Sequence, residues 1–204
     1  MRILVLTGSI GMGKSTAAAM LRRMGIPVHD ADAVVHRLLG RGGAAVAAVE
    51  AAFPGVVQKG VVDRAELGRR VFGNDAALRR LEAILHPMVR AAERAFLARQ
   101  RSRHVRLVVL DIPLLFETGA ERRCDAVAVV TAPAFLQAAR VLARPGMTPA
   151  RLAAVLAKQM PDADKCKRAD FVVPTGRGKG PALRRLRAIV RLMRATDRKM
   201  RPHA

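Results

Sequence analysis

Eight residues near the start of the chain, Gly8 to Ser15, match the pattern G-x-x-x-x-G-K-S. They follow a short apolar run at residues 2–7 and precede a helical pattern that ends near Met24, so they join a predicted strand to a predicted helix. In such a loop, glycines let backbone N–H groups turn toward oxygen atoms, and the helix N-terminus adds partial positive charge. The segment therefore predicts a phosphate-binding loop in which Lys14 reaches the β- and γ-phosphates of a nucleotide and Ser15 ligates Mg²⁺.

Acidic side chains after two predicted strands could complete this chemistry. Asp30 and Asp32 come directly after the second predicted strand, where open α/β sheets bind ligands, and a carboxylate there can accept the proton of an attacking hydroxyl. Each of the two could instead be the N-cap of the next helix. Asp111 follows the third predicted strand, where it either holds magnesium or simply begins a loop, and Glu117 is a further candidate.

Two arginines lie one helical turn apart in an arginine-rich stretch, Arg140 and Arg144. On one helix face they could close over phosphates, neutralise charge on a transferred group and exclude water. In a chain with 30 arginines they could instead form a solvated basic face, although their position after the fourth predicted strand favours a lid. His86 also has two interpretations, a residue that faces a nucleotide or a buried structural histidine.

The elements that must position these residues alternate between strands and helices, which predicts an α/β fold with a parallel sheet. A long stretch, residues 31–103, shows helical periodicity and no convincing strand, so we expect an inserted helical lobe. Within it Asp63 and Glu66 have the spacing of a capping box, and Pro87 marks the end of one helix and the start of another. The predicted strands cover residues 2–7, 26–29, 105–110, 126–131 and 171–173.

A second insertion runs from about residue 133 to 167 and contains the two spaced arginines, which suggests a lid. Thr131 and Thr148 are predicted N-caps of its helices, each followed closely by a proline. The last segment, Pro181 to Arg201, predicts an amphipathic helix. Its apolar face would consist of Leu183, Leu186, Val190 and Met193, with arginines on the other faces.

Composition limits the classes of protein to consider. The chain has 204 residues, 51% of them hydrophobic, and a formal net charge of +21, so it can bury a core despite its charge. Its two cysteines have neither metal-ligand nor disulfide spacing, which favours a reducing compartment. No apolar stretch is long enough to cross a membrane, and the first apolar run is broken at Thr7 and Gly8, so we expect a cytoplasmic protein without a membrane partner.

The positive charge raises the question of nucleic-acid binding. Residues 184–201 contain eight Lys or Arg and one Asp. Aromatic residues make up only 3% of the chain and no nucleic-acid motif is present, so we expect no obligate nucleic-acid partner. We interpret the basic end as a solvated face or an aid to solubility, because a large net charge keeps chains apart.

The order of these segments resembles the dephospho-coenzyme A kinase family, which phosphorylates the ribose 3′-hydroxyl of dephospho-CoA in the last step of coenzyme A synthesis. The resemblance covers roughly residues 2–175. Taken singly, only the segment that contains the phosphate-binding loop is a specific signal. The full set of segments in this order is specific for the family. The matching segments are Leu6 to Thr16, Asp30-Ala31-Asp32, Asp63-Arg64 with Leu67 and Phe72, Leu81 to Pro87, Pro113 to Glu117, Gln137 with Arg140 and Arg144, Gln159-Met160, and Lys165 ahead of Ala169-Asp170.

This resemblance implies an ATP-dependent kinase that uses Mg²⁺ and takes dephospho-CoA as a small-molecule substrate. It implies that Asp32 is the general base, that Arg140 is the lid arginine at the phosphates, and that Lys14 shares the catalytic role. The helical lobe would hold the dephospho-CoA. The residues that would bind ATP are Gly8, Gly11, Met12, Gly13, Lys14, Ser15, Thr16 and Arg144, and Ser15 would also be the magnesium ligand.

The resulting interpretation is a single P-loop kinase domain, residues 1–204, with two insertions. Its core would comprise about residues 1–30, 104–132 and 168–204, its helical substrate lobe about 31–103, and its arginine-rich lid about 133–167. Another small-molecule P-loop kinase stays open as an alternative, because substrate choice lies in the lobe. A nucleic-acid-associated P-loop NTPase is a third possibility, motivated by the net charge of +21.

Overall fold

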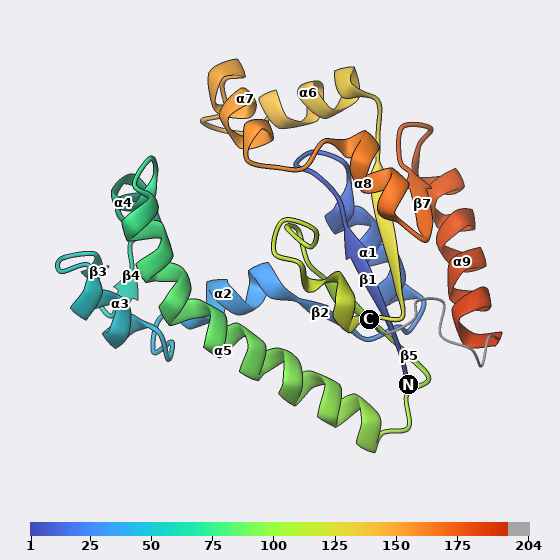
Figure 1. The fold of residues 1–204 in the computed structure, drawn as a ribbon, viewed down its shortest axis with the longest axis horizontal. Coiled ribbons are helices and arrows are strands. Elements are labelled where there is room, and N and C mark those ends of the chain that lie inside the picture. Colours follow the sequence, from blue (N-terminus) through green and yellow to red (C-terminus); the bar gives the residue numbers. More distant parts are fainter. Residues whose placement is uncertain (196–204) are drawn as a thin grey trace. The chain divides into compact units, whose positions relative to one another are not determined.

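The computed structural model describes residues 1–195, except the side chains of residues 122 and 123. Its main sheet has five strands in the order β2-β5-β1-β6-β7, and β1 pairs in parallel with both β5 and β6, as β6 does with β7. Helices flank this sheet, which confirms the predicted α/β fold (Figure 1). The strands are β1 (Arg2–Thr7), β2 (Val28–Asp30), β5 (Leu107–Asp111), β6 (Ala126–Thr131) and β7 (Phe171–Pro174).

The chain divides into two compact units. The first contains Met1–His29 and the chain from Gln100 onward, and the second contains Asp30–Arg99. The loop at residues 8–15 and nearly all of the five-stranded sheet belong to the first unit, whereas the second unit is mostly helical.

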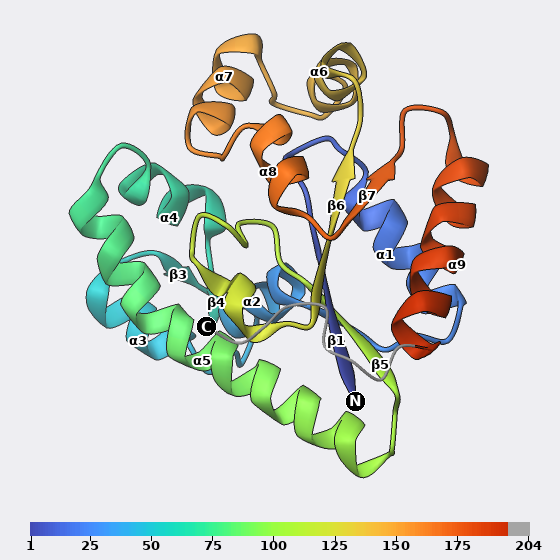
Figure 2. The same ribbon diagram turned by 45° about the vertical axis from the view of Figure 1, so that its right-hand side comes forward.

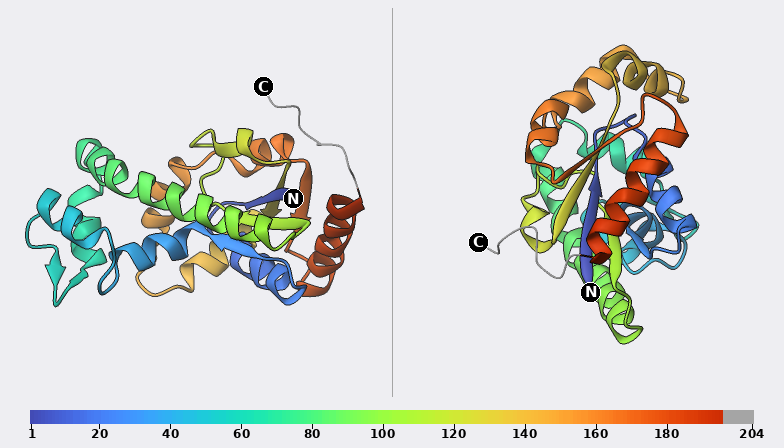
Figure 3. Two further views of the ribbon diagram at one scale, coloured as in Figure 1. Left: turned by 90° about the horizontal axis from the view of Figure 1, so that it is seen from below. Right: turned by 90° about the vertical axis from the view of Figure 1, so that its right-hand side faces the viewer.

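The sheet of the first unit is covered on both faces, which explains why its strands are continuous apolar runs. Leu4 and Leu6 of β1 have no exposed surface. Helices α1 (Lys14–Arg23) and α9 (Lys179–Ala195) lie on one side of the sheet and α8 (Asp162–Arg168) on the other (Figure 2). Because α1 and α9 lie side by side, their apolar faces share one core with the sheet (Figure 3).

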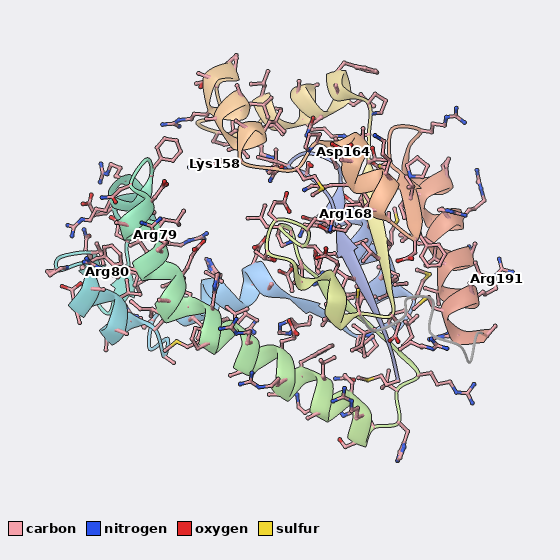
Figure 4. The ribbon with its side chains drawn as sticks, viewed as in Figure 1. Arg79, Arg80, Lys158, Asp164, Arg168 and Arg191 are labelled. Atoms are coloured by element: carbon pink, nitrogen blue, oxygen red, sulfur yellow. The ribbon has the colours of Figure 1, made fainter. Side chains whose placement is uncertain are left out.

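Helix α9 has the amphipathic pattern that the sequence predicts. Leu186, Val190 and Met193 are buried and Leu183 packs against the same core, while Arg191 points away from the sheet on the outer side of the helix (Figure 4). The predicted helix extends to Arg201, and its part from residue 196 lies outside the described residues.

Helices α6 (Ala134–Leu142) and α7 (Pro149–Ala157) lie beyond the carboxyl ends of the strands (Figure 1). The predicted cap at Thr148 is confirmed, since its side chain accepts a hydrogen bond from the Arg151 N–H at 3.2 Å. The predicted cap at Thr131 is wrong. Thr131 ends β6 and its hydroxyl donates to Asp162 Oδ2, while α6 begins after Pro133 without a side-chain cap.

The second unit is mostly helical, around a separate apolar cluster. Asp63 caps a helix by accepting from two backbone N–H groups, as its spacing predicts. Glu66, however, pairs with arginines of its own helix instead of returning to the cap. The helices are α2 (Ala31–Leu39), α3 (Val46–Ala52), α4 (Arg64–Val71) and α5 (Asp75–Ser102). The last three residues of α5, from Gln100, belong to the first unit.

Two expectations for this lobe are wrong. Pro87 does not divide two helices, because α5 runs through it from Asp75 to Ser102. A proline inside a helix removes one backbone hydrogen bond at a cost of about 3 kcal/mol, and Leu81 and Leu85, buried just before it, offset that cost. The lobe also contains strands, the two-residue β3 (Val57–Gln58) and β4 (Val61–Val62), which pair antiparallel.

This hairpin turns through Lys59 and Gly60, with φ values of +52° and +76°. Two positive φ values are the signature of a turn that matches the twist of a tight hairpin. Glycine adopts this conformation readily, whereas lysine seldom does, so the turn signal in the sequence is weak.

The packing of α9 can be tested with two leucines of the same helix. Leu186 is fully buried and Leu192 is 50% exposed. We expect Leu186→Ala to lower the free energy of unfolding by about 2–5 kcal/mol, because it leaves a cavity against the sheet, and Leu192→Ala to change it by less than about 1 kcal/mol. Urea unfolding of the two variants measures both values, and equal losses would contradict this orientation of α9.

Candidate functional site

The loop between β1 and α1 has the backbone of an anion cradle. Its glycines at 8, 11 and 13 have φ values of +155°, +76° and +92°, which side chains other than hydrogen seldom allow. A Cβ on Gly8 would lie 2.6 Å from the Val130 carbonyl oxygen, and one on Gly11 would lie 2.6 Å from Val141 Cγ2. The loop is therefore packed closely against β6 and α6, and its shape requires these glycines.

Helix α1 begins directly after this loop. Its N-cap is Gly13, which offers no side chain to the first N–H groups of the helix. These N–H groups carry the positive end of the helix dipole, so the end of the loop presents donors to an anion. The hydroxyl-bearing residues Ser15 and Thr16 are exposed in the first turn of α1.

Lys14 lies at the mouth of the loop and is paired with an aspartate. Its Nζ is 2.6 Å from Asp111 Oδ1, and the two side chains are 14% and 3% exposed. Asp111 is the last residue of β5, so its carboxylate lies at the carboxyl edge of the sheet rather than in a loop. The interpretation of Asp111 as the first residue of a loop is therefore wrong, and the structure brings this residue to Lys14.

Side chains of α6 hold the loop from its other side. Gln137 Nε2 donates to the Ile10 carbonyl at 2.8 Å, and Arg140 Nη1 donates to the Gly11 carbonyl at 3.3 Å. Gln137 and Arg140 are three residues apart and thus share one face of the helix. Arg140 is thereby placed against the loop, which excludes the interpretation of this residue as part of a solvated basic face.

Arg144 follows the end of α6 and is exposed. Among the described residues, none accepts a hydrogen bond from its guanidinium or pairs with it. The structure therefore brings together the loop, Lys14, Asp111 and Arg140, and it leaves Arg144 facing solvent.

Asp30, which ends β2, and Asp32, which follows it in α2, differ in what they bind. Asp30 is the N-cap of α2, since its Oδ1 accepts from the Ala33 N–H at 2.9 Å. Asp32 is in the first turn of the same helix and is exposed, and within the described part of the chain no group donates to its carboxylate or pairs with it. The capping alternative therefore holds for Asp30, and Asp32 keeps a carboxylate that is available for other chemistry.

A buried ion pair joins α8 to the segment after β5. Lys165 has no exposed side-chain surface, and its Nζ lies 2.8 Å from Glu117 Oε1. The same oxygen accepts from the Met160 N–H at 2.9 Å. Burial raises the pKa of Glu117, but the contacts with Lys165 and Met160 outweigh it, so the pKa lies below its ordinary value of 4.5. Glu117 thus acts as an anchor for α8.

A second contact joins the same two segments. Arg168 of α8 pairs with Glu121, and its guanidinium lies 4.6 Å from the centroid of the Phe116 ring. A guanidinium in this position is stabilised both by the Glu121 carboxylate and by the face of the Phe116 ring. Together with the buried pair, it fixes α8 to the segment that follows β5.

His86 and the cysteines show no sign of a metal site. His86 is exposed on α5, so the interpretation as a buried structural histidine is wrong. Both cysteines are free, and the described residues include no group of three or more His, Cys, Asp or Glu side chains that could hold a metal ion. In the same part of the chain, no helix is long and apolar enough to span a membrane.

The buried pair gives a test of stability against pH. We expect Glu117→Gln to cost about 3–5 kcal/mol near neutral pH, because it leaves the buried Lys165 ammonium without its carboxylate. Lys165→Met should cost less, since the Glu117 side chain is 17% exposed and can still accept from Met160. The double variant should lose less than the sum of the two, which urea unfolding at pH 7 measures.

The lowered pKa of Glu117 determines how its contribution to the free energy of unfolding changes with pH. Glu117 contributes stability that is full above its unfolded-state value near 4.5 and disappears as the pH falls through its lower folded-state value. The difference in unfolding free energy between the natural chain and Glu117→Gln should therefore shrink below pH 4.5. A difference that stays constant down to pH 3 would show that the pair does not contribute in this way.

Comparisons with known proteins agree on one family. A family model for dephospho-CoA kinase matches residues 2–178. The curated dephospho-CoA kinase of Paramagnetospirillum magneticum is 74% identical over 196 residues, covering 96% of this chain and 92% of that protein. The one from Rhodospirillum rubrum is 60% identical over 211 residues, covering 99% and 100%.

Solved structures show the same likeness. A crystal structure of a protein from Thermus thermophilus has a TM-score of 0.80 and 39% identity, covering 94% of this chain and 97% of that one. A dephospho-CoA kinase from Campylobacter jejuni has a TM-score of 0.69 and 25% identity, covering 94% and 96%.

Proposed function

The chain belongs to the dephospho-CoA kinase family, and on this premise we propose that it transfers the γ-phosphoryl group of ATP to the ribose 3′-hydroxyl of dephospho-CoA. The products are coenzyme A and ADP. The observation that carries this proposal is the glycine loop before α1, with Lys14 at its mouth and Arg140 against its backbone. Convergent N–H groups and positive charges are what a polyphosphate needs from a protein.

Within this reaction the loop binds and orients ATP. The residues we assign to the nucleotide are Gly8, Gly11, Met12, Gly13, Lys14, Ser15, Thr16 and Arg144. Lys14 and Arg140 stabilise the negative charge that develops on the γ-phosphoryl group, because fixed cations beside the transferred group lower the barrier. The position of Arg140 at the Gly11 carbonyl supports its role, since it keeps the guanidinium next to the loop.

The oxygen groups near Lys14 suit Mg²⁺, which prefers hydroxyl, carboxylate and phosphate oxygens. Ser15 exposes its hydroxyl in the first turn of α1, and Asp111 has a carboxylate at the carboxyl end of β5. We assign Ser15 as the protein ligand. Bound Mg²⁺ would neutralise charge on the phosphates.

Asp32 is the general base in this proposal. It accepts the proton of the 3′-hydroxyl as that oxygen attacks the γ-phosphorus, while the bond from the γ-phosphorus to the bridging oxygen breaks and ADP leaves. We assign this role to Asp32 and not to Asp30 because only the Asp30 carboxylate caps a helix, by accepting a hydrogen bond from the Ala33 N–H. We further propose that the second unit holds the dephospho-CoA and that the enzyme works in the cytoplasm.

The proposed reaction predicts a strict choice of acceptor. We expect rapid ADP release from ATP and Mg²⁺ in the presence of dephospho-CoA, and much slower release with AMP or adenosine. Coupled ADP release together with mass analysis of the acceptor measures this choice. Turnover with AMP or adenosine and none with dephospho-CoA would leave the phosphate-binding loop in place and overturn the acceptor.

The base assignment can be tested with two neighbouring aspartates. We expect Asp32→Asn to retain ATP binding while kcat falls by about 10²–10⁴-fold, because the proton acceptor is lost. Asp30→Asn is the matched control, since asparagine caps a helix as well as aspartate does. It should retain near-normal kcat. Unchanged turnover in Asp32→Asn, or an equal loss in both variants, would refute the assignment.

A further inference from the structure

Three successive carbonyl groups of the phosphate-binding loop are held from outside by side chains. Gln137 and Arg140 hold the first two, as described above. The third belongs to Met12, and its oxygen accepts from Thr175 Oγ1 at 2.7 Å. Thr175 comes directly after β7, so this contact joins the loop to a segment more than 160 residues away.

The hydrogen bond from Thr175 to the Met12 carbonyl also determines where the next N–H group of the loop points. In a trans peptide the carbonyl oxygen and the next N–H point in opposite directions. A Met12 carbonyl that points toward Thr175 therefore turns the Gly13 N–H away from Thr175. Gly13 has a φ of +92° and no side chain, so the backbone alone does little to prevent this peptide from rotating. An external hydrogen bond is what sets its orientation.

We propose that Thr175 is a positioning residue for ATP, because its hydroxyl fixes the Met12–Gly13 peptide so that the Gly13 N–H faces the nucleotide phosphates. This inference rests on the proposed function, in which ATP occupies the loop. The proposal gives Thr175 no contact with the acceptor or the transferred group. It acts through the backbone of the loop.

Hydrogen bonds hold the N–H, the carbonyl and the hydroxyl of Thr175 in place. Its N–H donates to the Thr131 carbonyl at 2.8 Å, and its own carbonyl accepts from Arg140 Nη2 at 3.0 Å. Its hydroxyl has one proton to donate, and the Met12 oxygen at 2.7 Å is closer than the Thr131 oxygen at 3.2 Å. Arg140 Nη1 donates to the same hydroxyl at 3.1 Å, and a donor with positive charge strengthens the bond that the hydroxyl makes.

Steric contact reinforces the hydrogen bond. A Cβ on Gly13 would lie 3.2 Å from Thr175 Oγ1 and 3.3 Å from its Cγ2. Thr175 therefore lies directly against the peptide whose orientation it sets. Removal of the hydroxyl alone, with the shape kept, separates the hydrogen bond from this packing.

The experiment compares Thr175→Val, which replaces the hydroxyl by a methyl group, with Thr175→Ser, which keeps it. We expect the Kd for ATP, measured by calorimetry with Mg²⁺ and without acceptor, to rise about tenfold in Thr175→Val, which corresponds to about 1.4 kcal/mol. KM for ATP should rise with it, while KM for dephospho-CoA stays within about twofold. Thr175→Ser should restore ATP binding to within about threefold of the natural chain.

Thr118→Val is the matched control. Its hydroxyl also donates to a backbone carbonyl, that of Leu114 at 2.8 Å, but not to the phosphate-binding loop. It should leave the Kd for ATP unchanged. Circular dichroism and thermal unfolding of all three variants check that each retains the fold.

The outcomes separate this inference from the proposed function. ATP binding that is unchanged in Thr175→Val would overturn the positioning role, and so would an equal loss in Thr175→Val and Thr175→Ser. An equal rise in Kd in Thr118→Val would also overturn it. If the natural chain binds ATP but does not phosphorylate dephospho-CoA, the proposed acceptor fails, and the calorimetric comparison still decides the role of Thr175.

Discussion

The orientation of a few peptide groups is the constraint on which the candidate site depends. A loop that surrounds phosphates with N–H groups needs backbone angles that only glycine adopts readily, and glycine in turn leaves those peptides free to rotate. In this fold, side chains from other elements donate hydrogen bonds to the carbonyl groups of the loop and so fix the orientation of its peptides. Gln137 and Arg140 come from α6, and Thr175 directly follows β7, so the cradle depends on elements far from it in sequence.

The strands, the phosphate-binding loop and the apolar face of α9 could be predicted because local pattern determines each of them. The lobe was harder to predict. Pro87 continues a helix because its buried neighbours offset the lost hydrogen bond, and this compensation is tertiary. The hairpin around Lys59 and Gly60 has strands of two residues each, too short for any alternation to show.

The site shows the same division between local and long-range information. Lys14 and the loop glycines follow from a motif, and the spacing of Gln137 and Arg140 already places them on one helix face. The hydroxyl of Thr175 is one among several, and its role depends on a contact across 163 positions. Lys165 looks like any surface lysine in the sequence, yet it has no exposed surface because Glu117 is available to pair with it. Contacts between residues this far apart in the sequence produce no periodic pattern from which they could be predicted.

Acidic groups are scarce in this chain, with 16 Asp and Glu against 37 Lys and Arg, and the structure uses several of them for buried or partly buried cations. The pair of Lys14 and Asp111 places a negative charge beside the cation of the loop. An anion that approaches the Lys14 ammonium also approaches a carboxylate whose oxygen lies 2.6 Å from the same nitrogen. Attraction by the ammonium is therefore partly offset by repulsion from Asp111. The affinity of the loop for any anion is lower than the charge of Lys14 alone would give.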